Sequence, residues 1–181
     1  MQKLRLPVRL YVLAVIAGAV VAFAATPFMP ASGSIDPALL ISFFAVATIA
    51  NLRVVHVNAK TKISVGGSAV FAAVLTAVPV AAMIVGALST FIGLRFATSQ
   101  PLYNRLFNAS GTALAAAAAA WLHRGFARGS GLLDDPLVIV ASAATYYLVK
   151  TGITYIVVAL QTHRNPLRTW WPEHRRDVFH H

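Results

Sequence analysis

Long apolar runs, separated by short basic or turn-forming segments, dominate the pattern of hydrophobic and polar positions along the chain. The clearest example lies between Lys62 and Arg95, where no residue is charged and Pro79 divides the stretch into two runs of roughly 17 residues. In a water-soluble domain such runs would have to be buried on every side, whereas a helix of about 20 apolar residues crosses a bilayer. The pattern therefore predicts two membrane helices joined by a tight turn at Pro79.

Four further apolar runs extend this arrangement to about six helices. They cover residues 10–29, 38–55, 106–121 and 136–160. Helices satisfy their backbone hydrogen bonds internally, as the bilayer interior requires. We therefore expect an all-α fold, a polytopic integral membrane bundle of about six transmembrane helices over residues 1–162, followed by a basic amphipathic tail over residues 163–181.

The basic residues predict how these helices are oriented. Lys and Arg gather before the first run, between the second and third runs, and after residue 162. Because cytoplasmic loops are enriched in Lys and Arg, both termini are expected in the cytoplasm. Arg124 and Arg128 depart from this rule, since six crossings place their loop outside. The basic start of the chain is also typical of a signal peptide, but the run that follows has nearly full membrane length, which favours a retained first helix.

The composition supports a membrane protein and argues against other classes. Hydrophobic residues make up 58% of the chain and charged residues 11%, whereas soluble domains carry about 25% charged residues. The net charge is +10, but the basic residues occur in short clusters between apolar runs, so nucleic acid is not an expected partner. The expected partner is the lipid bilayer of a bacterial inner membrane. Cysteine is absent, which excludes disulfides and thiolate metal sites.

Lys150 is the most informative polar residue, because it lies in the interior of the last predicted helix. A charged side chain there costs several kcal/mol unless it reaches the headgroups or finds a partner. All five carboxylates lie in predicted loops or in the tail, at Asp36, Asp134, Asp135, Glu173 and Asp177. Two main interpretations stay open: Lys150 extends to the cytoplasmic headgroups, or it binds an anionic or polar ligand. A Schiff base to a chromophore is disfavoured, because no intramembrane carboxylate is available as counter-ion.

Four other polar residues complete the candidate ligand site. Asn108, Thr151 and Tyr147 are expected near Lys150, and Asn51 is expected near headgroup depth at the end of the second helix. No Ser-His-Asp set, paired carboxylates or glycine-rich phosphate loop is present, so we expect no catalytic residue. His56 and His123 have no second ligand at helical spacing, so neither a metal site nor another cofactor is expected.

Small residues predict close helix contacts at two places. Ala14, Gly18 and Ala22 recur every four residues on the first helix, a spacing that allows either packing within the bundle or docking of a separate partner. Gly66 and Gly67 lie near the start of the third helix. They permit either close packing or local unwinding that exposes backbone to a ligand.

Three segments together resemble a known family. They are HVNAKTKISVGGSAVFAAVL at residues 56–75, PLYNRLFNAS at residues 101–110 and YYLVKTGITYIVVALQTHRNPLRTWW at residues 146–171. Their order and spacing resemble the multi-span N-terminal membrane sensor region of bacterial cyclic-di-GMP signalling proteins, which precedes GGDEF or HD-GYP domains. The resemblance implies a sensory module whose movement is read by an output domain. Lys150 stands where the family pattern has asparagine, and no cyclic-di-GMP chemistry is carried over to these residues.

The sequence is compatible with three functions. The first is a ligand-sensing or small-molecule-binding membrane module that is not an enzyme and acts on a signalling output domain. The second is the substrate-binding component of an energy-coupling-factor type transporter, to which the chain is loosely similar, with a transporter partner docked on the first helix or the basic tail. The third is a structural subunit of a membrane complex. Each is compatible with a homo-oligomer.

Overall fold

The structure is a computed structural model that describes residues 5–28, 36–52, 54–56, 62–64, 66–97, 100–127 and 135–162. Within these ranges it contains six α-helices, which confirms the expected all-α bundle. The elements are α1 (Leu6–Ala25), a 3-10 turn η1 (Thr26–Phe28), α2 (Pro37–Leu52), β1 (Val54–His56), β2 (Lys62–Ser64), α3 (Gly66–Thr76), α4 (Pro79–Ala97), α5 (Leu102–Phe126) and α6 (Pro136–Thr162).

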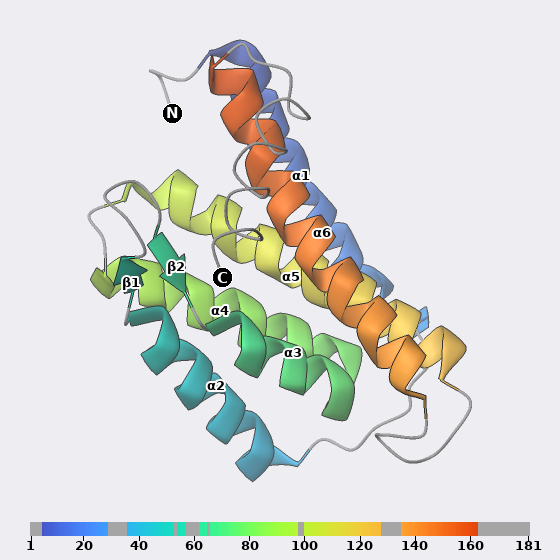
Figure 1. The fold of residues 1–181 in the computed structure, drawn as a ribbon. Helices are drawn as coiled ribbons and strands as arrows, with labels where there is room; N and C mark the ends of the chain where they lie inside the picture. The colour runs from blue at the N-terminus through green and yellow to red at the C-terminus, as the bar shows by residue number, and fades with distance from the viewer. Residues whose placement is uncertain are drawn as a thin grey trace, which may run out of the picture.

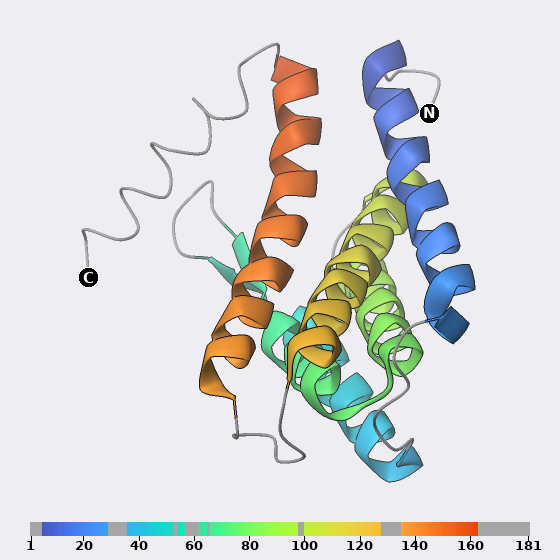
Figure 2. The ribbon, with the colours of Figure 1, turned by 90° about the vertical axis from the view of Figure 1, so that its right-hand side faces the viewer.

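Helix α5 is the centre of the bundle. It packs against α1 and α6 on one side and against α3 and α4 on the other, and α2 covers the outer side of α3 and α4. Successive helices run in alternating directions, so the start of α1 and the end of α6 lie at the same end of the molecule (Figures 1 and 2). This alternation agrees with two termini on one side of a membrane, the arrangement that the basic residues predict.

The alanine-rich half of α5 explains why it can occupy the centre. Its fully buried side chains include Ala113, Ala115, Ala116, Ala119 and Ala120. Alanine favours the helix and adds little bulk, so neighbouring helices approach closely on every side, as small residues allow in membrane bundles. The apolar side chains of α2, α3 and α4 form one cluster against this half, and Val8, Val12, Val15 and Phe107 form a second cluster among α1, α5 and α6.

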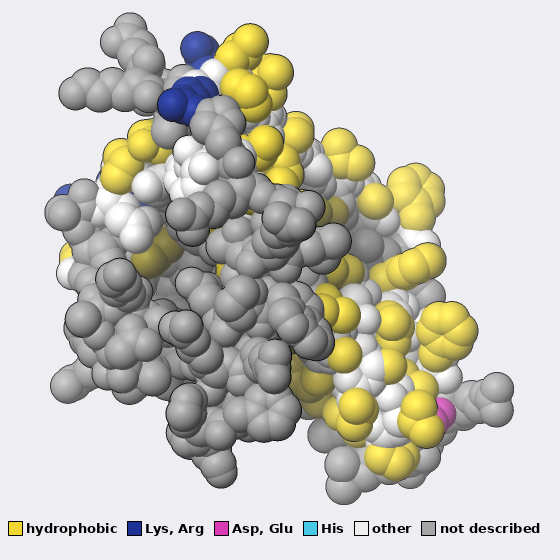
Figure 3. Space-filling model, turned by 45° about the horizontal axis from the view of Figure 1, so that its top comes forward, with side chains coloured by type: hydrophobic (Ala, Val, Ile, Leu, Met, Phe, Trp, Pro, Cys, Tyr) yellow, Lys and Arg dark blue, Asp and Glu magenta, His cyan; other side chains and the backbone are white. Residues whose placement is uncertain are grey.

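Three of the described helices are long and apolar enough to cross a membrane. They span Leu6–Phe28, Pro79–Phe96 and Pro136–Thr162, whereas α2 and α3 are shorter apolar helices. Exposed hydrophobic side chains cover the outer faces of these helices, and Lys and Arg gather at the end where α1 begins (Figure 3). This surface is typical of a protein that presents its apolar faces to lipid.

The segment between the second and third predicted helices differs from the prediction. Helix α2 ends at Leu52 instead of continuing to residue 55, and β1 and β2 form an antiparallel ribbon with Val55 opposite Ile63. The β-branched side chains of Val54, Val55 and Ile63 favour this extended conformation. Arg53 and Lys60, which contribute to the predicted basic end of the second helix, lie outside the described residues.

Because of this ribbon, α3 is a half-length helix. Its 11 residues extend about 16 Å, roughly half the hydrocarbon thickness of a bilayer. The chain reverses directly after it, since α3 ends at Thr76 and α4 begins at Pro79, which confirms the predicted turn. Helix α3 therefore starts inside the bundle, at about half its depth (Figure 1).

Asn51 fits between two glycines of neighbouring helices. A Cβ atom at Gly66 of α3 would overlap the Asn51 amide, and a Cβ atom at Gly93 of α4 would overlap the Asn51 Cβ. Neither glycine is in the left-handed backbone region. Glycine is therefore required at both positions because a side chain would overlap Asn51, and not because of the backbone conformation. Contact of this closeness fixes the end of α2 against the start of α3.

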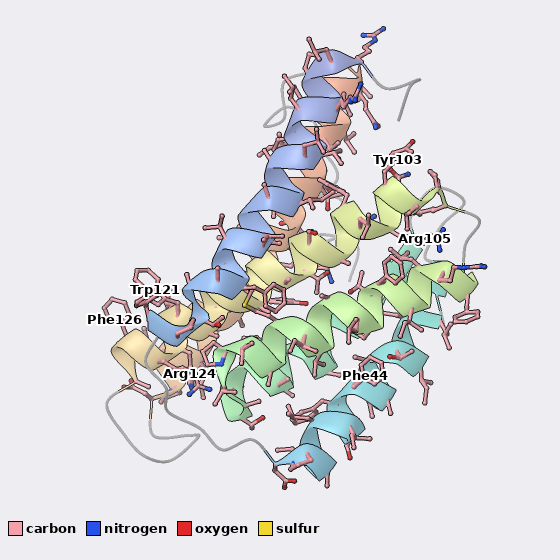
Figure 4. All side chains as sticks on the ribbon, turned by 180° about the vertical axis from the view of Figure 1, so that it is seen from behind. Phe44, Tyr103, Arg105, Trp121, Arg124 and Phe126 are labelled. Carbon is pink, nitrogen blue, oxygen red and sulfur yellow. The ribbon has the colours of Figure 1, made fainter. Side chains whose placement is uncertain are left out.

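Arg124 stabilises the opposite end of the bundle. Its guanidinium donates a hydrogen bond to the carbonyl of Ala77, directly after the last residue of α3. Arg124 points from α5 towards the turn between α3 and α4, whereas Trp121 and Phe126 point away from the bundle (Figure 4). A cation at a helix C-terminus is favourable, and exposed aromatic side chains at a helix end are typical of the membrane interface.

The glycine contacts predict how substitutions change stability. Gly66→Ala and Gly93→Ala should each lower the free energy of unfolding by about 1–3 kcal/mol, because an inserted methyl group overfills a packed site. Gly152→Ala is the control, since nothing lies within 4 Å of its added Cβ. Thermal unfolding of the purified protein in detergent measures all three variants.

A second substitution tests the geometry itself. Asn51→Ala removes the amide but keeps the Cβ, so in a double-mutant cycle it should relieve the cost of Gly66→Ala and leave that of Gly93→Ala unchanged. If Asn51→Ala restored the stability of Gly66→Ala and Gly93→Ala equally, the amide of Asn51 would not face Gly66 while its Cβ faces Gly93.

Candidate ligand site

A polar stripe runs along the face of α5 that looks towards α6. Asn104, Asn108 and Thr112 recur every four residues and therefore share one side of the helix. The Asn108 amide donates to the carbonyl of Asn104 over 2.8 Å, and the Thr112 hydroxyl donates to the carbonyl of Asn108 over 3.0 Å. Thr90 of α4 donates to the Thr112 hydroxyl over 3.3 Å. Asn108 also lines both cavities described below.

Polar residues of α6 face this stripe. Lys150, Thr154 and Gln161 line the same cavities as the asparagines of α5. The Thr154 hydroxyl donates its hydrogen to the carbonyl of Lys150 over 3.1 Å. The donor of this hydroxyl is therefore used within α6, and its oxygen can still accept a hydrogen bond. Two polar helix faces therefore meet between the two apolar clusters of the bundle.

Two adjoining cavities occupy the space between these faces. The larger, of about 170 Å³, is here named the polar cleft and is lined by Val8, Val12, Gln100, Tyr103, Asn104, Phe107, Asn108, Thr154, Val157 and Gln161. The smaller, of about 20 Å³, lies deeper and is lined by Phe107, Asn108, Gly111, Thr112, Lys150, Ile153 and Thr154. The two cavities share three lining residues, Phe107, Asn108 and Thr154, so they adjoin each other. The polar cleft lies at the end of the bundle where the Lys and Arg side chains gather.

The Lys150 side chain points into the bundle. Its Nζ lies 5.6 Å from the centre of the Tyr146 ring, one turn back towards the start of α6. A lysine that extended to the headgroups beyond Thr162 would have to point the other way, towards the end of α6. Of the two main interpretations, the geometry agrees with the one in which Lys150 faces an internal polar site.

Among the residues that the structure describes, Lys150 has no carboxylate partner. The described carboxylates are Asp36 and Asp135, directly before the first residues of α2 and α6. The interactions that the structure gives the Lys150 ammonium are the contact with the Tyr146 ring and its place beside the small cavity. A cation–π contact supplies about 0.5–2 kcal/mol, less than the cost of a charge at mid-membrane.

The structure separates the remaining predicted residues from this site. Thr151 and Tyr147 are not among the residues that line the two cavities, and the Thr151 hydroxyl donates to the carbonyl of Tyr147 over 2.7 Å. The Tyr147 side chain is 47% exposed on the outer face of α6. Asn51 is packed against Gly66 and Gly93. Lys150 and Asn108 are the predicted residues that the structure brings to one cavity.

Tyr146 and Thr154 are the neighbours of Lys150 that the sequence analysis did not select. They lie four residues before and four residues after Lys150, which places all three on one helix face. Helical phase, applied to Lys150, would have identified both. Gln100, on the other side of the polar cleft, has a buried side-chain oxygen without a hydrogen-bond partner among the described residues.

The small residues of α1 have different environments. Gly18 faces Leu114 of α5, whose Cδ1 would lie 3.8 Å from an added Cβ, and Ala22 packs against the central apolar cluster. Ala14 is exposed on the outer face of α1. Packing within the bundle therefore accounts for Gly18 and Ala22.

A separate groove between α2 and α4 lacks polar groups. Its volume is about 340 Å³, and it is lined by Leu40, Ile41, Phe44, Val80, Ala81, Ile84, Val85 and Leu88. Phe44 projects from α2 towards α4 at this place (Figure 4). Acyl chains can fill such a groove, but it offers nothing that would select a polar ligand.

The fold and the polar cleft together define a helical membrane module with an internal polar site. The sequence model of the MASE9 family matches residues 34–173, so the chain belongs to this family, one of the membrane-associated sensor domains of signalling proteins. The match begins after α1 and includes α2 to α6. No curated protein and no solved structure shows significant similarity to the chain.

The absence of cysteine allows the polar cleft to be mapped with single introduced thiols. A small charged thiol reagent should modify Thr154→Cys roughly tenfold faster than Thr151→Cys, because the reactive thiolate forms only where water enters. Rates measured in membranes by mass shift, with Asn108→Cys as a second cleft position, test this expectation. Equal rates at residues 151 and 154 would show that water does not enter between α5 and α6.

Proposed function

We propose that this chain is the ligand-binding input module of a membrane signalling protein. In this proposal a small hydrophilic molecule enters the polar cleft from the cytoplasmic end of the bundle and contacts Asn108, Thr154 and Lys150. The observation that carries the proposal is a pair of adjoining cavities, lined by polar residues of α5 and α6, that lead towards a cation in the middle of a membrane helix. Polar residues inside a membrane are costly and are typical of functional sites.

The size and lining of the polar cleft suit a small polar molecule. At about 170 Å³ it is below the range of drug-sized pockets, about 300–1,000 Å³. Its asparagine, glutamine, threonine and tyrosine side chains supply both donors and acceptors. A compact metabolite or ion fits this description better than a large cofactor does.

Helix α6 provides a route from the site to an output domain. It continues without interruption from Lys150 to Thr162, and the basic segment of residues 163–181 follows. We infer that the output is cyclic-di-GMP turnover by a GGDEF or HD-GYP domain that is joined to, or docked on, this segment. The sequence resemblance to the membrane regions of such proteins supports this inference.

Native mass spectrometry of the protein in detergent or nanodiscs tests ligand binding. Wild-type protein should carry a small co-purifying species, and Thr154→Val and Asn108→Leu should lose most of it, because each removes a polar contact worth about 1 kcal/mol or more. Thr145→Val is the matched control: Thr145 also donates to the carbonyl four residues before it, over 2.8 Å, but it does not line either cavity. A species retained equally by all variants would contradict binding in the polar cleft.

A reporter fusion tests the signalling step. When a diguanylate cyclase domain follows residue 181, Thr154→Val should change the cellular cyclic-di-GMP level, because the ligand no longer biases α6, while Thr145→Val should leave it at the wild-type level. The measurement is cyclic-di-GMP per cell by mass spectrometry at matched protein abundance. A bound ligand without any effect on cyclase output would count against the sensor function and favour a transport component that docks on an energising partner.

A further inference from the structure

The start of α3 is an electropositive helix end placed inside the bundle. The first four N–H groups of a helix have no acceptor within it, and the helix dipole adds partial positive charge there. Helix α3 begins at Gly66, at about half the depth of the bundle, and its first turn faces α6. Half-length helices that end inside a membrane protein direct such N-termini at anionic groups.

Two polar groups of α6 lie beside this helix end. An added Cβ at Gly67, the second residue of α3, would lie 3.8 Å from Lys150 Nζ and 3.8 Å from the Tyr146 hydroxyl. Because Gly67 has no side chain, the ammonium, the hydroxyl and the backbone of the first turn face one another without an intervening group. Gly67 is about 80 residues before Tyr146 and Lys150 in the sequence.

The Tyr146 hydroxyl is buried, and no described residue forms a hydrogen bond with it. Only 7% of the Tyr146 residue is exposed, and its hydroxyl oxygen has no hydrogen-bond partner among the described residues. Buried hydroxyl groups in native proteins are nearly always paired with protein or water. An unpaired hydroxyl that faces a helix N-terminus and a lysine therefore indicates that a further group completes this site.

The charges at this place have one sign. A cation next to a helix N-terminus is unfavourable, and the two carboxylates that the structure describes, Asp36 and Asp135, lie directly before α2 and α6 and not beside it. An anion between α3 and α6 would reverse this electrostatic conflict. It would accept hydrogen bonds from the ammonium, the hydroxyl and the N–H group of Gly67 in the first turn of α3 at once.

We propose that Lys150, the Tyr146 hydroxyl and the first turn of α3 bind one anionic group, a carboxylate or a phosphate. The proposal rests on the function proposed above and deepens it, because it assigns a charge to the ligand that enters the polar cleft. The small cavity beside Lys150 lies between α5 and α6, and no residue of α3 lines it. Because even an added Cβ at Gly67 would lie 3.8 Å from Lys150 Nζ, a carboxylate or phosphate between α3 and α6 requires these helices to move apart, and that movement couples the site to the output.

The test compares anion-dependent stability in two kinds of nanodisc. The full chain is placed in phosphatidylcholine discs, and its thermal midpoint is followed against inorganic phosphate, with chloride at equal ionic strength as the reference. A second set of discs contains phosphatidylglycerol and receives no added phosphate. Stabilisation by phosphate in the first discs identifies a soluble anion, and stabilisation by phosphatidylglycerol alone identifies a lipid headgroup. Both results support the proposal if they depend on the residues named.

Four variants establish that dependence. Lys150→Met should raise the half-maximal anion concentration by about tenfold or more, and Tyr146→Phe by about fivefold, as expected for a charged and a neutral hydrogen bond. Tyr155→Phe is the control: residue 155 is nine positions after Tyr146, on the opposite side of α6. Lys150→Arg should retain stabilisation, because it keeps the charge.

The outcomes separate this proposal from the proposed function. No stabilisation by either anion, or equal stabilisation in wild type, Lys150→Met and Tyr146→Phe, would overturn the anion site. If the species seen by native mass spectrometry is lost in Asn108→Leu but kept in Tyr146→Phe and Lys150→Met, the polar cleft binds a ligand and the anion assignment fails. If phosphate binds through Lys150 and Tyr146 while no species co-purifies, the anion site holds and the sensor function loses its support.

Discussion

The close packing of α5 against its neighbours is the interaction on which the rest of this structure depends. A polar stripe in a membrane protein must be enclosed by protein or water, because lipid offers no hydrogen bonds. The buried alanines of α5 let α3 and α4 approach on one side, and the larger Phe107 and Leu114 meet α1 and α6 on the other. Asn104, Asn108 and Thr112 lie between these two contacts, so the same packing that excludes lipid leaves a narrow polar space towards α6.

Hydropathy was sufficient to predict the helices but not the interruption between α2 and α3. Length and apolar content identify a membrane helix, and the turn at Pro79 follows from the excess of apolar residues over one crossing. Neither property reports where a helix stops inside the bundle. Helix α3 starts at Gly66, where its start was expected, and Asn51 of α2 fits there between Gly66 and Gly93. That contact joins residues of three elements, so no local pattern contains it.

Some residues of the candidate site could likewise be predicted from the sequence, and others could not. Lys150 and Asn108 were identified because a polar residue in an apolar helix is costly. Thr151 and Tyr147 were selected for nearness along the chain, whereas neighbours at one and three residues from Lys150 point about 100° and 60° away from it around the helix. Tyr146 and Thr154, at four residues in either direction, share its face. Tyrosine also counts as hydrophobic in composition, which hid the hydroxyl that the structure leaves unpaired.

The helix count predicts that the loop after α5 lies outside, although Arg124 and Arg128 give it more positive charge than such loops usually carry. The fold explains the charge of Arg124. The positive-inside rule treats loop charges as free, but the Arg124 guanidinium is bound to the carbonyl of Ala77 at the end of α3. It thus holds the outer end of α3 while the inner end faces Lys150. A helix of 11 residues fixed at its outer end can tilt more readily than it can slide, so an anion at Gly67 would act by separating the start of α3 from α6.

That displacement has a defined path through the bundle. One turn beyond Lys150, the carbonyl of Ile153 accepts a hydrogen bond from the Tyr11 hydroxyl of α1 over 3.2 Å. The Ile153 side chain packs against Gly111, where an added Cβ would lie 3.4 Å from its Cγ2. A shift of α6 at Lys150 must therefore either move α1 with it or break the Tyr11 contact. Since the start of α1 and the end of α6 both lie where the basic tail begins, each alternative changes the surface that an output domain would meet.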